Sequence, residues 1–300
     1  MPATESRNAL LAAILAFVGE GGQELLALED IRAQLERELD SAGDTAILGL
    51  MARLAEDHGW DYYAPDPLAR RIHHLLADRF LTPDSTAHGL EHLPGAGLGV
   101  PLIIVANHLS YADANVVEVL LQRGGATPLA ERLTAVAGPK VFTSRQRRFS
   151  SLCFGTIKVP QSADVASGDA VLNAREIARA ARRAIDVAHV RLAAGDTLLL
   201  FPEGTRSRSA AMQPLLPAVA RYLEFPGAVV VPAGLTGSES LFPVDGALRP
   251  ARVSVTFGEA VPAEQLFARA GRNRRGLMDG IGSAVAALLP SSYRGVYDRP

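Results

Sequence analysis

The sequence from Ile103 to Asp113 is IIVANHLSYAD, and this stretch indicates the fold class of the chain. An apolar, largely β-branched run stops abruptly at an asparagine and a histidine, and an aspartate follows five residues after the histidine. Such a run predicts a strand buried on both faces. The next stretch, DANVVEVLLQRG at 113–124, spaces its apolar residues as a helix does. We therefore expect a buried strand, a polar turn and a helix.

The same alternation continues toward the carboxyl terminus. Further strands are predicted at 133–138, 155–161, 197–204, 228–235 and 252–261, with helices at 172–195 and 212–224. Alternating strands and helices predict layers around a common sheet. The expected fold class is α/β, with a mainly buried mixed sheet flanked by helices and preceded by an N-terminal helical region.

The first part of the chain has a different pattern. Apolar residues recur at helical spacing within 27–39, 45–59 and 66–81, and Asp66 is a candidate helix N-cap. TPDSTAHGLEHLPGAGLG at 82–99 is rich in residues that break periodic structure. The predicted division is a helical N-terminal domain at 1–81, a linker at 82–99 and an α/β domain at 100–300.

Composition excludes several classes of protein. The net charge of −2 over 300 residues gives no electrostatic argument for nucleic-acid binding, and the single cysteine, Cys153, excludes an intramolecular disulfide. The longest apolar run, within NALLAAILAFVG at 8–19, falls well short of the roughly 20 residues that span a bilayer. We expect a packed or interfacial helix there. The chain is expected to be cytoplasmic, with peripheral contact at the inner face of a membrane as an option.

His108 and Asp113 form the first candidate site. Ligands of open α/β sheets bind at the carboxyl ends of strands, where His108 is expected. An aspartate five residues later can accept the Nδ1 proton of the imidazole, which leaves Nε2 as a base. The alternative is a buried histidine that makes only structural hydrogen bonds, beside an aspartate that caps the N-terminus of a helix. The spacing alone does not decide between the two.

A second strand end supplies positive charge. TLLLFPEGTRSRS at 197–209 ends in a turn that carries Glu203, Gly204, Thr205 and Arg206. Glycine lets the backbone approach a ligand closely, and a guanidinium is a planar fork suited to phosphate or carboxylate. The turn is therefore a candidate anion site.

The two stretches together resemble the glycerolipid acyltransferase family. Its NHxSxxD motif is matched by Asn107, His108, Ser110 and Asp113, and its FPEGTRS motif by 201–207. The resemblance extends over roughly 101–259.

The resemblance implies roles for individual residues. His108 would be the general base, and Asp113 would orient its ring. The substrate-binding residues that the resemblance implies are Asn107, Ser110, Lys140, Lys158, Glu203, Gly204, Thr205 and Arg206. The two lysines are the only ones in the chain and would be cations beside the acceptor phosphate.

The implied reaction moves a fatty acyl group from acyl-CoA or acyl carrier protein to a glycerophosphate hydroxyl, without a cofactor or metal. We rank lysophosphatidic acid (1-acylglycerol-3-phosphate) first as acceptor, followed by glycerol-3-phosphate and then by another lysolipid or a phosphate-free alcohol. Two alternatives from other classes are an acyl-thioester hydrolase and a catalytically silent lipid- or carrier-binding protein.

Two other patterns are set aside. HGLEH at 88–92 has the spacing of some zinc peptidases, but Gly89 interrupts the helix that such a motif needs. His73 and His74 are expected to be surface residues of an amphipathic helix. No metal site is therefore predicted. The chain also lacks the G-x-S-x-G elbow of serine hydrolases, and Ser110 is expected to cap a helix.

Overall fold

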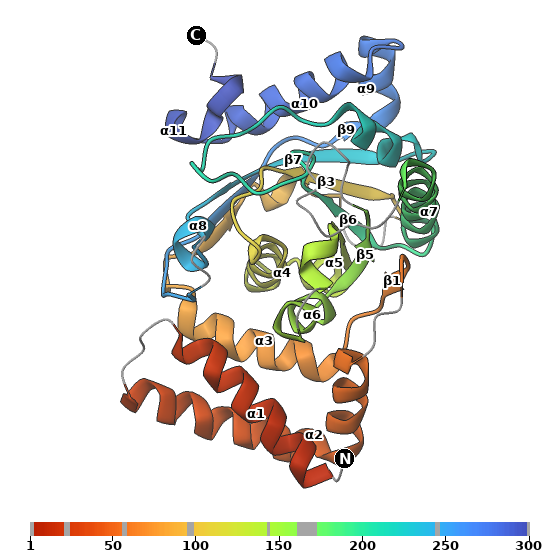
Figure 1. Cartoon of the computed structure of the whole chain (residues 1–300). Helices are drawn as coiled ribbons and strands as arrows, with labels where there is room; N and C mark the ends of the chain where they lie inside the picture. The colour runs from red at the N-terminus through yellow and green to blue at the C-terminus, as the bar shows by residue number, and fades with distance from the viewer. Residues whose placement is uncertain are drawn as a thin grey trace.

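The structure is a computed structural model that describes residues 3–20, 25–55, 59–94, 99–142, 145–160, 173–243 and 247–298. One sheet organises it, with strand order β1-β5-β4-β6-β3-β7-β8-β2 and β9 paired with β7 (Figure 1). The central pairs among β5, β4, β6, β3 and β7 are parallel, and β8 runs antiparallel to β7. This mixed sheet confirms the predicted fold class.

The strands follow the predicted apolar runs. They are β3 (Leu102–Ala106), β4 (Leu133–Ala137), β5 (Gly155–Lys158), β6 (Thr197–Leu200), β7 (Val229–Thr236), β8 (Ser254–Phe257) and β9 (Val261–Pro262). Every residue of β3, β5 and β6 is buried. Because successive side chains point to opposite faces, Ile103 and Ile104 belong to two different core clusters. Both faces of the sheet are thus covered.

Helices cover each face, as Figure 1 shows. On one side lie α7 (Ala174–Ala193), α9 (Ala263–Ala270), α10 (Arg274–Ala287) and α11 (Ser291–Arg294), together with the 3-10 helix η4 (Pro217–Glu224). On the other side lie α4 (Asp113–Arg123), α5 (Thr127–Glu131) and α6 (Arg145–Leu152). The shorter helix α8 (Ser238–Leu241) follows β7.

The N-terminal helices form a further layer. They are α1 (Ala3–Gly19), α2 (Leu25–Ala55), which is kinked at Gly43, and α3 (Pro67–Phe80). The Asp66 side chain accepts hydrogen bonds from the backbone N–H groups of Leu68 and Ala69, so the predicted N-cap is confirmed. α3 lies between α4 and the other two helices (Figure 1).

Two short strands correct the expected secondary structure. β1 (Tyr62–Tyr63) pairs antiparallel with β5, and β2 (Thr86–His88) pairs parallel with β8. The segment 82–99 was expected to lack regular structure, yet it contributes one edge of the sheet. The segment 212–224 also differs, because Pro217 begins a 3-10 helix and not an α-helix. The division into domains itself stays a prediction.

None of the helices in the described part of the chain is both long and apolar enough to cross a membrane.

Candidate functional site

His108 and Asp113 meet directly where β3 gives way to α4. The His108 Nδ1 lies 2.8 Å from the Asp113 Oδ2. The His108 ring stacks on Phe201, which follows β6, with centroids 4.6 Å apart. Because Nδ1 is held by the carboxylate, Nε2 is the ring nitrogen that remains to act as a base. His108 also lines a cavity of about 360 Å³. The expected pairing of imidazole and carboxylate is therefore present.

The Asp113 carboxylate sits in a dense set of donors. It is fully buried, and it accepts hydrogen bonds from the backbone N–H groups of Leu109 and Ser110 and from the Ser110 hydroxyl. The Ser238 hydroxyl donates a further bond of 2.5 Å from the start of α8. Hydrogen bonds to the charged form stabilise a buried carboxylate, so Asp113 is held in place from three sides.

Backbone register brings the second strand end to the first. β3 and β6 are adjacent and parallel, with Val105 opposite Leu200. The loop after β6 is then joined to His108 at two points. The His108 N–H donates to the Glu203 Oε1 at 2.8 Å, and the Ser207 N–H donates to the His108 carbonyl oxygen at 2.8 Å. The two motifs, about ninety residues apart, form one site.

Glu203 acts as a brace within this loop. It is buried, and its second oxygen accepts a hydrogen bond of 2.7 Å from the Gln213 N–H. Burial raises the pKa of Glu203 to about 7, against the opposing effect of the N–H groups of Gln213 and His108. Its contacts are with the backbone, and it is not among the described residues that line the cavity.

The expected substrate-binding residues divide into two groups. Those that line the cavity with His108 are Ser110, Lys140, Gly204, Thr205 and Arg206. Asn107 lies outside that lining, because its side chain is bonded to the backbone N–H and carbonyl of Leu235 at 2.7 and 2.9 Å. Asn107 and Glu203 thus bond to the backbone around the site, and their expected role in substrate binding stays a prediction.

Lys158 is also placed elsewhere. It is 6% exposed, and its Nζ lies 4.8 Å from the centroid of the Trp60 ring and 5.1 Å from that of Phe142. Lys140 is exposed and lines the cavity. Lys158 is not in the described lining of that cavity, and the expectation that both lysines stand beside the acceptor phosphate stays a prediction.

Three contributors were not predicted. Tyr111 occupies a variable position of the first motif, and the guanidinium carbon of Arg206 lies 4.2 Å from the centroid of its ring. Phe201 supports the imidazole, and Ser238 supports Asp113 from the start of α8. The strand pairing of β3 with β7 is what brings Ser238 close, and sequence spacing does not reveal that pairing.

A second cavity, of about 220 Å³, adjoins the first. Its lining is almost wholly apolar and comes from the N-terminal helices, α4, α6 and α8, with Ile14, Phe17 and Phe80 among the contributing residues. Tyr111, Val141 and Ser150 line both cavities. A polar site at the sheet edge is therefore next to a hydrophobic chamber.

The fold and the site define an α/β protein with a histidine–aspartate pair and an arginine-bearing turn at the carboxyl edge of a mixed sheet. A family model described as Acyltransferase matches residues 84–236, which is half of the chain. The chain belongs to this acyltransferase family. The resemblance inferred from the two motifs is thereby confirmed.

Two relatives illustrate the similarity. A 1-acyl-sn-glycerol-3-phosphate acyltransferase of Chlamydomonas reinhardtii is 34% identical over 106 residues, which cover 35% of this chain and 30% of that protein. The chain thus matches less than a third of that relative's length. The crystal structure of the 1-acyl-sn-glycerophosphate (LPA) acyltransferase PlsC from Thermotoga maritima has a TM-score of 0.49 and 18% identity, covering 80% of this chain and 87% of that one.

Proposed function

We propose that the protein is an O-acyltransferase that moves a fatty acyl group from acyl-CoA or acyl carrier protein to the hydroxyl of a glycerophosphate. Lysophosphatidic acid is the acceptor that we rank first. The observation that carries the proposal is the His108 Nδ1–Asp113 Oδ2 contact of 2.8 Å, made at a cavity that Arg206 also lines.

In the proposed reaction, the His108 Nε2 takes the proton of the acceptor hydroxyl. The hydroxyl oxygen attacks the thioester carbonyl carbon, the new C–O bond forms and the C–S bond breaks. The leaving thiolate then takes the proton from the imidazolium, whose charge Asp113 stabilises. General-base catalysis of this kind contributes about 10²–10⁴-fold, and alignment of the two substrates adds to it. The transfer needs no metal or prosthetic group.

Acceptor binding is assigned to the cationic side of the cavity. The guanidinium carbon of Arg206 lies 4.2 Å from the centroid of the Tyr111 ring, and Arg206, Tyr111 and Lys140 line the same cavity as His108. Gly204 has a φ of +72°, a conformation that favours glycine, and a Cβ there would meet the Leu216 side chain at 2.5 Å. A glycerol phosphate has a phosphate that Arg206 and Lys140 would bind and a hydroxyl that His108 would deprotonate. The name of the Chlamydomonas relative supports the same acceptor class.

The fatty acyl chain is assigned to the apolar cavity. The chain must leave water while its thioester carbonyl stays near His108, and the apolar cavity shares Tyr111, Val141 and Ser150 with the polar one. Because α1, α2 and α3 all contribute to that lining, the N-terminal helices would form part of the binding site for the donor. A cytoplasmic protein in peripheral contact with a membrane would meet such lipids at the bilayer surface.

The decisive experiment compares wild-type protein, His108→Ala and a control variant, His88→Ala, with acyl-CoA as the donor. His88 is an exposed histidine on β2. We expect acceptor-dependent release of CoA by the wild type and the control, and a loss of about 10²–10⁴-fold in His108→Ala. Transfer at the wild-type rate by His108→Ala would refute the mechanism.

The acceptor panel separates the remaining functions. It comprises lysophosphatidic acid, glycerol-3-phosphate, a lysolipid with another headgroup, a phosphate-free alcohol and no acceptor. Thiol release without any alcohol would identify a thioester hydrolase, and binding without turnover would identify a silent carrier-binding protein. Arg206→Ala should selectively weaken the binding of acceptors that carry a phosphate, since the guanidinium makes no ion pair with a phosphate-free alcohol.

A further inference from the structure

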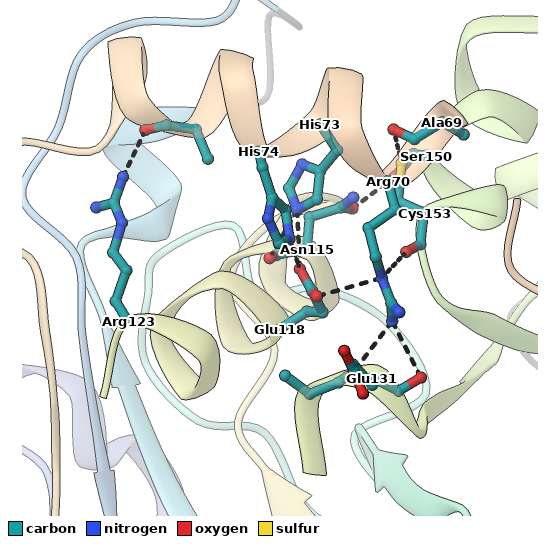
Figure 2. Close-up of polar contacts among 12 residues, drawn as sticks. Ala69, Arg70, His73, His74, Asn115, Glu118, Arg123, Glu131, Ser150 and Cys153 are labelled. Carbon is teal, nitrogen blue, oxygen red and sulfur yellow. Dashed lines mark hydrogen bonds and ion pairs between the residues drawn. The ribbon is translucent and has the colours of Figure 1, made fainter. Parts of the chain in front are cut away.

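A second cluster of ionisable side chains lies one helical turn beyond the site, between α3 and α4. His73 and His74 project from α3 toward Glu118 of α4, as Figure 2 shows. The His74 Nε2 lies 2.8 Å from the Glu118 Oε2, and the His73 Nε2 lies 3.5 Å from the same oxygen. One potential ligand atom from each of the three residues lies within 4.8 Å of the others.

Burial makes this cluster unusual. The Glu118 side chain is 0% exposed, while the His73 and His74 side chains are 12% and 28% exposed. Burying a carboxylate is costly unless charge and hydrogen bonds compensate for the lost water. Yet among the described residues the Glu118 Oε1 accepts no hydrogen bond. Its contact is an ion pair with the Arg70 Nε at 3.4 Å.

We propose that His73, His74 and Glu118 form a binding site for a zinc-like divalent transition-metal ion. Two imidazole nitrogens and one carboxylate oxygen are a ligand set that zinc favours, whereas magnesium and calcium favour oxygen ligands throughout. Water would complete the coordination from the side of His74, whose partial exposure also gives the ion an entry path. This inference does not depend on acyl transfer.

The surroundings of the cluster fix its carboxylate. Arg70 donates hydrogen bonds to the carbonyl oxygens of Cys153, Ala130 and Glu131 at 3.2, 3.0 and 3.2 Å (Figure 2). The guanidinium is thus anchored while it faces one Glu118 oxygen, which leaves the other oxygen for the two rings. Groups that orient a ligand in this way raise the affinity of a metal site.

Hydrogen bonds within the protein hold the cluster together. The His73 Nε2 lies 3.1 Å from the Asn115 carbonyl oxygen, and the Ser150 hydroxyl donates to the Asn115 side chain at 2.6 Å (Figure 2). With an ion bound, each ring would carry its proton on Nδ1 and give its Nε2 lone pair to the metal. The protein should therefore fold without metal and be stabilised when metal binds, as a ligand specific for the folded state requires.

The position of the site gives the ion a structural role. α4 begins at Asp113, and Glu118 lies five residues further along the same helix. An ion held by two residues of α3 and one of α4 would fasten the N-terminal helical layer to the helix that presents the Asp113 carboxylate. It would not touch the reacting atoms, because its ligands are distinct from the described lining of the polar cavity; His73 lines the apolar cavity instead.

The test uses the full chain without a histidine tag, stripped with a chelator and titrated calorimetrically with Zn²⁺. The variants are His73→Gln and His74→Gln, and His88→Ala is the matched control. Glutamine can still donate a hydrogen bond to Glu118, so both variants should fold, which circular dichroism checks. We expect one equivalent of Zn²⁺ per wild-type or control chain, and at least tenfold weaker binding in both variants.

Two further readouts keep the result specific. Co²⁺ in place of Zn²⁺ should give visible absorption bands in the wild type that both variants lose. The thermal midpoint should rise with Zn²⁺ in the wild type and the control but not in the variants. The proposal is overturned if the wild type binds no stoichiometric ion, or if His73→Gln and His74→Gln bind it as tightly as the control. Neither outcome depends on whether the acyltransfer assay succeeds.

Discussion

At the scale of single residues, the site depends on how completely the Asp113 carboxylate is surrounded. Its donors come from the turn itself and from Ser238, more than a hundred residues away in the sequence. The nearby donors follow from the NHxSxxD spacing and could be anticipated from it. Ser238 could not, because only the neighbouring positions of β3 and β7 bring the start of α8 to the carboxylate.

Ser238→Ala tests this distant donor. The fully buried hydroxyl donates to Asp113 at 2.5 Å, and hydrogen bonds to charged groups contribute about 1.5–3 kcal/mol. We expect a loss of that size in the free energy of unfolding, measured by denaturant titration, and a lower kcat because the ring of His108 is less firmly oriented. Ser283→Ala is the control, since that hydroxyl donates to a backbone carbonyl on the exposed side of α10. Equal stability of the two variants would contradict this role.

Glu203 gives a pH-dependent prediction. Burial raises its pKa to about 7 from an ordinary value of 4.5, so between these pH values the folded chain holds a proton that the unfolded chain has released. The contribution of Glu203 to stability therefore falls as pH rises through that interval, by at most about 1.4 kcal/mol per pH unit. Glu203→Gln lacks this titration.

The measurement is the free energy of unfolding of wild type and Glu203→Gln at several pH values between 4.5 and 7. The advantage of the wild type over the variant should shrink as pH rises. Glu264→Gln, an exposed position in the first turn of α9, should run parallel to the wild type. A constant difference between wild type and Glu203→Gln would show that the Glu203 carboxyl titrates alike in both states.

At the scale of elements, the long strands and helices were predictable, and the short ones were not. Runs such as LIIVA and TLLL are continuous and apolar because both sheet faces are covered. β1 and β2 have two and three residues, too few to show a period. They become strands only because β5 and β8 offer unpaired edges. Tertiary context, which local pattern does not contain, also placed the Lys158 ammonium near the rings of Trp60 and Phe142.

Asn107 shows how one side chain joins two elements. Asn107 follows β3 directly, and Leu235 lies in the adjacent strand β7. The Asn107 side-chain amide donates to the Leu235 carbonyl oxygen and accepts from the Leu235 N–H, as a neighbouring peptide group would. Asn107→Ala would leave a buried N–H and a buried carbonyl unpaired, at about 1–3 kcal/mol each. We expect a loss of about 2–6 kcal/mol in the free energy of unfolding, measured by denaturant titration. A loss below about 0.5 kcal/mol, typical of surface substitutions, would be inconsistent with a structural role for the Asn107–Leu235 hydrogen bonds.

At the scale of the whole molecule, the N-terminal helices and the sheet share one core. A single buried cluster includes Leu10 and Ile14 of α1, Leu35 of α2, Ile72 of α3 and Ile104 of β3. The periodicity of the sequence predicted the helices but not this packing. An apolar helix face indicates that the face is buried, but it does not indicate which element buries it. The apolar cavity lies within that shared region, so its shape depends on both parts of the chain.

Ala13→Phe tests whether this cavity receives the acyl chain. Ala13 of α1 lines the cavity, and a phenyl ring there would occupy part of its volume of about 220 Å³. Transfer from long-chain acyl-CoA should fall several-fold in kcat/KM, because a long chain would lose room to bury its end, while transfer from short-chain donors should be unchanged. Ala12→Phe is the matched control, since Ala12 is exposed on the same helix and is not part of the described lining. If both variants keep the chain-length profile of the wild type, the acyl chain lies elsewhere.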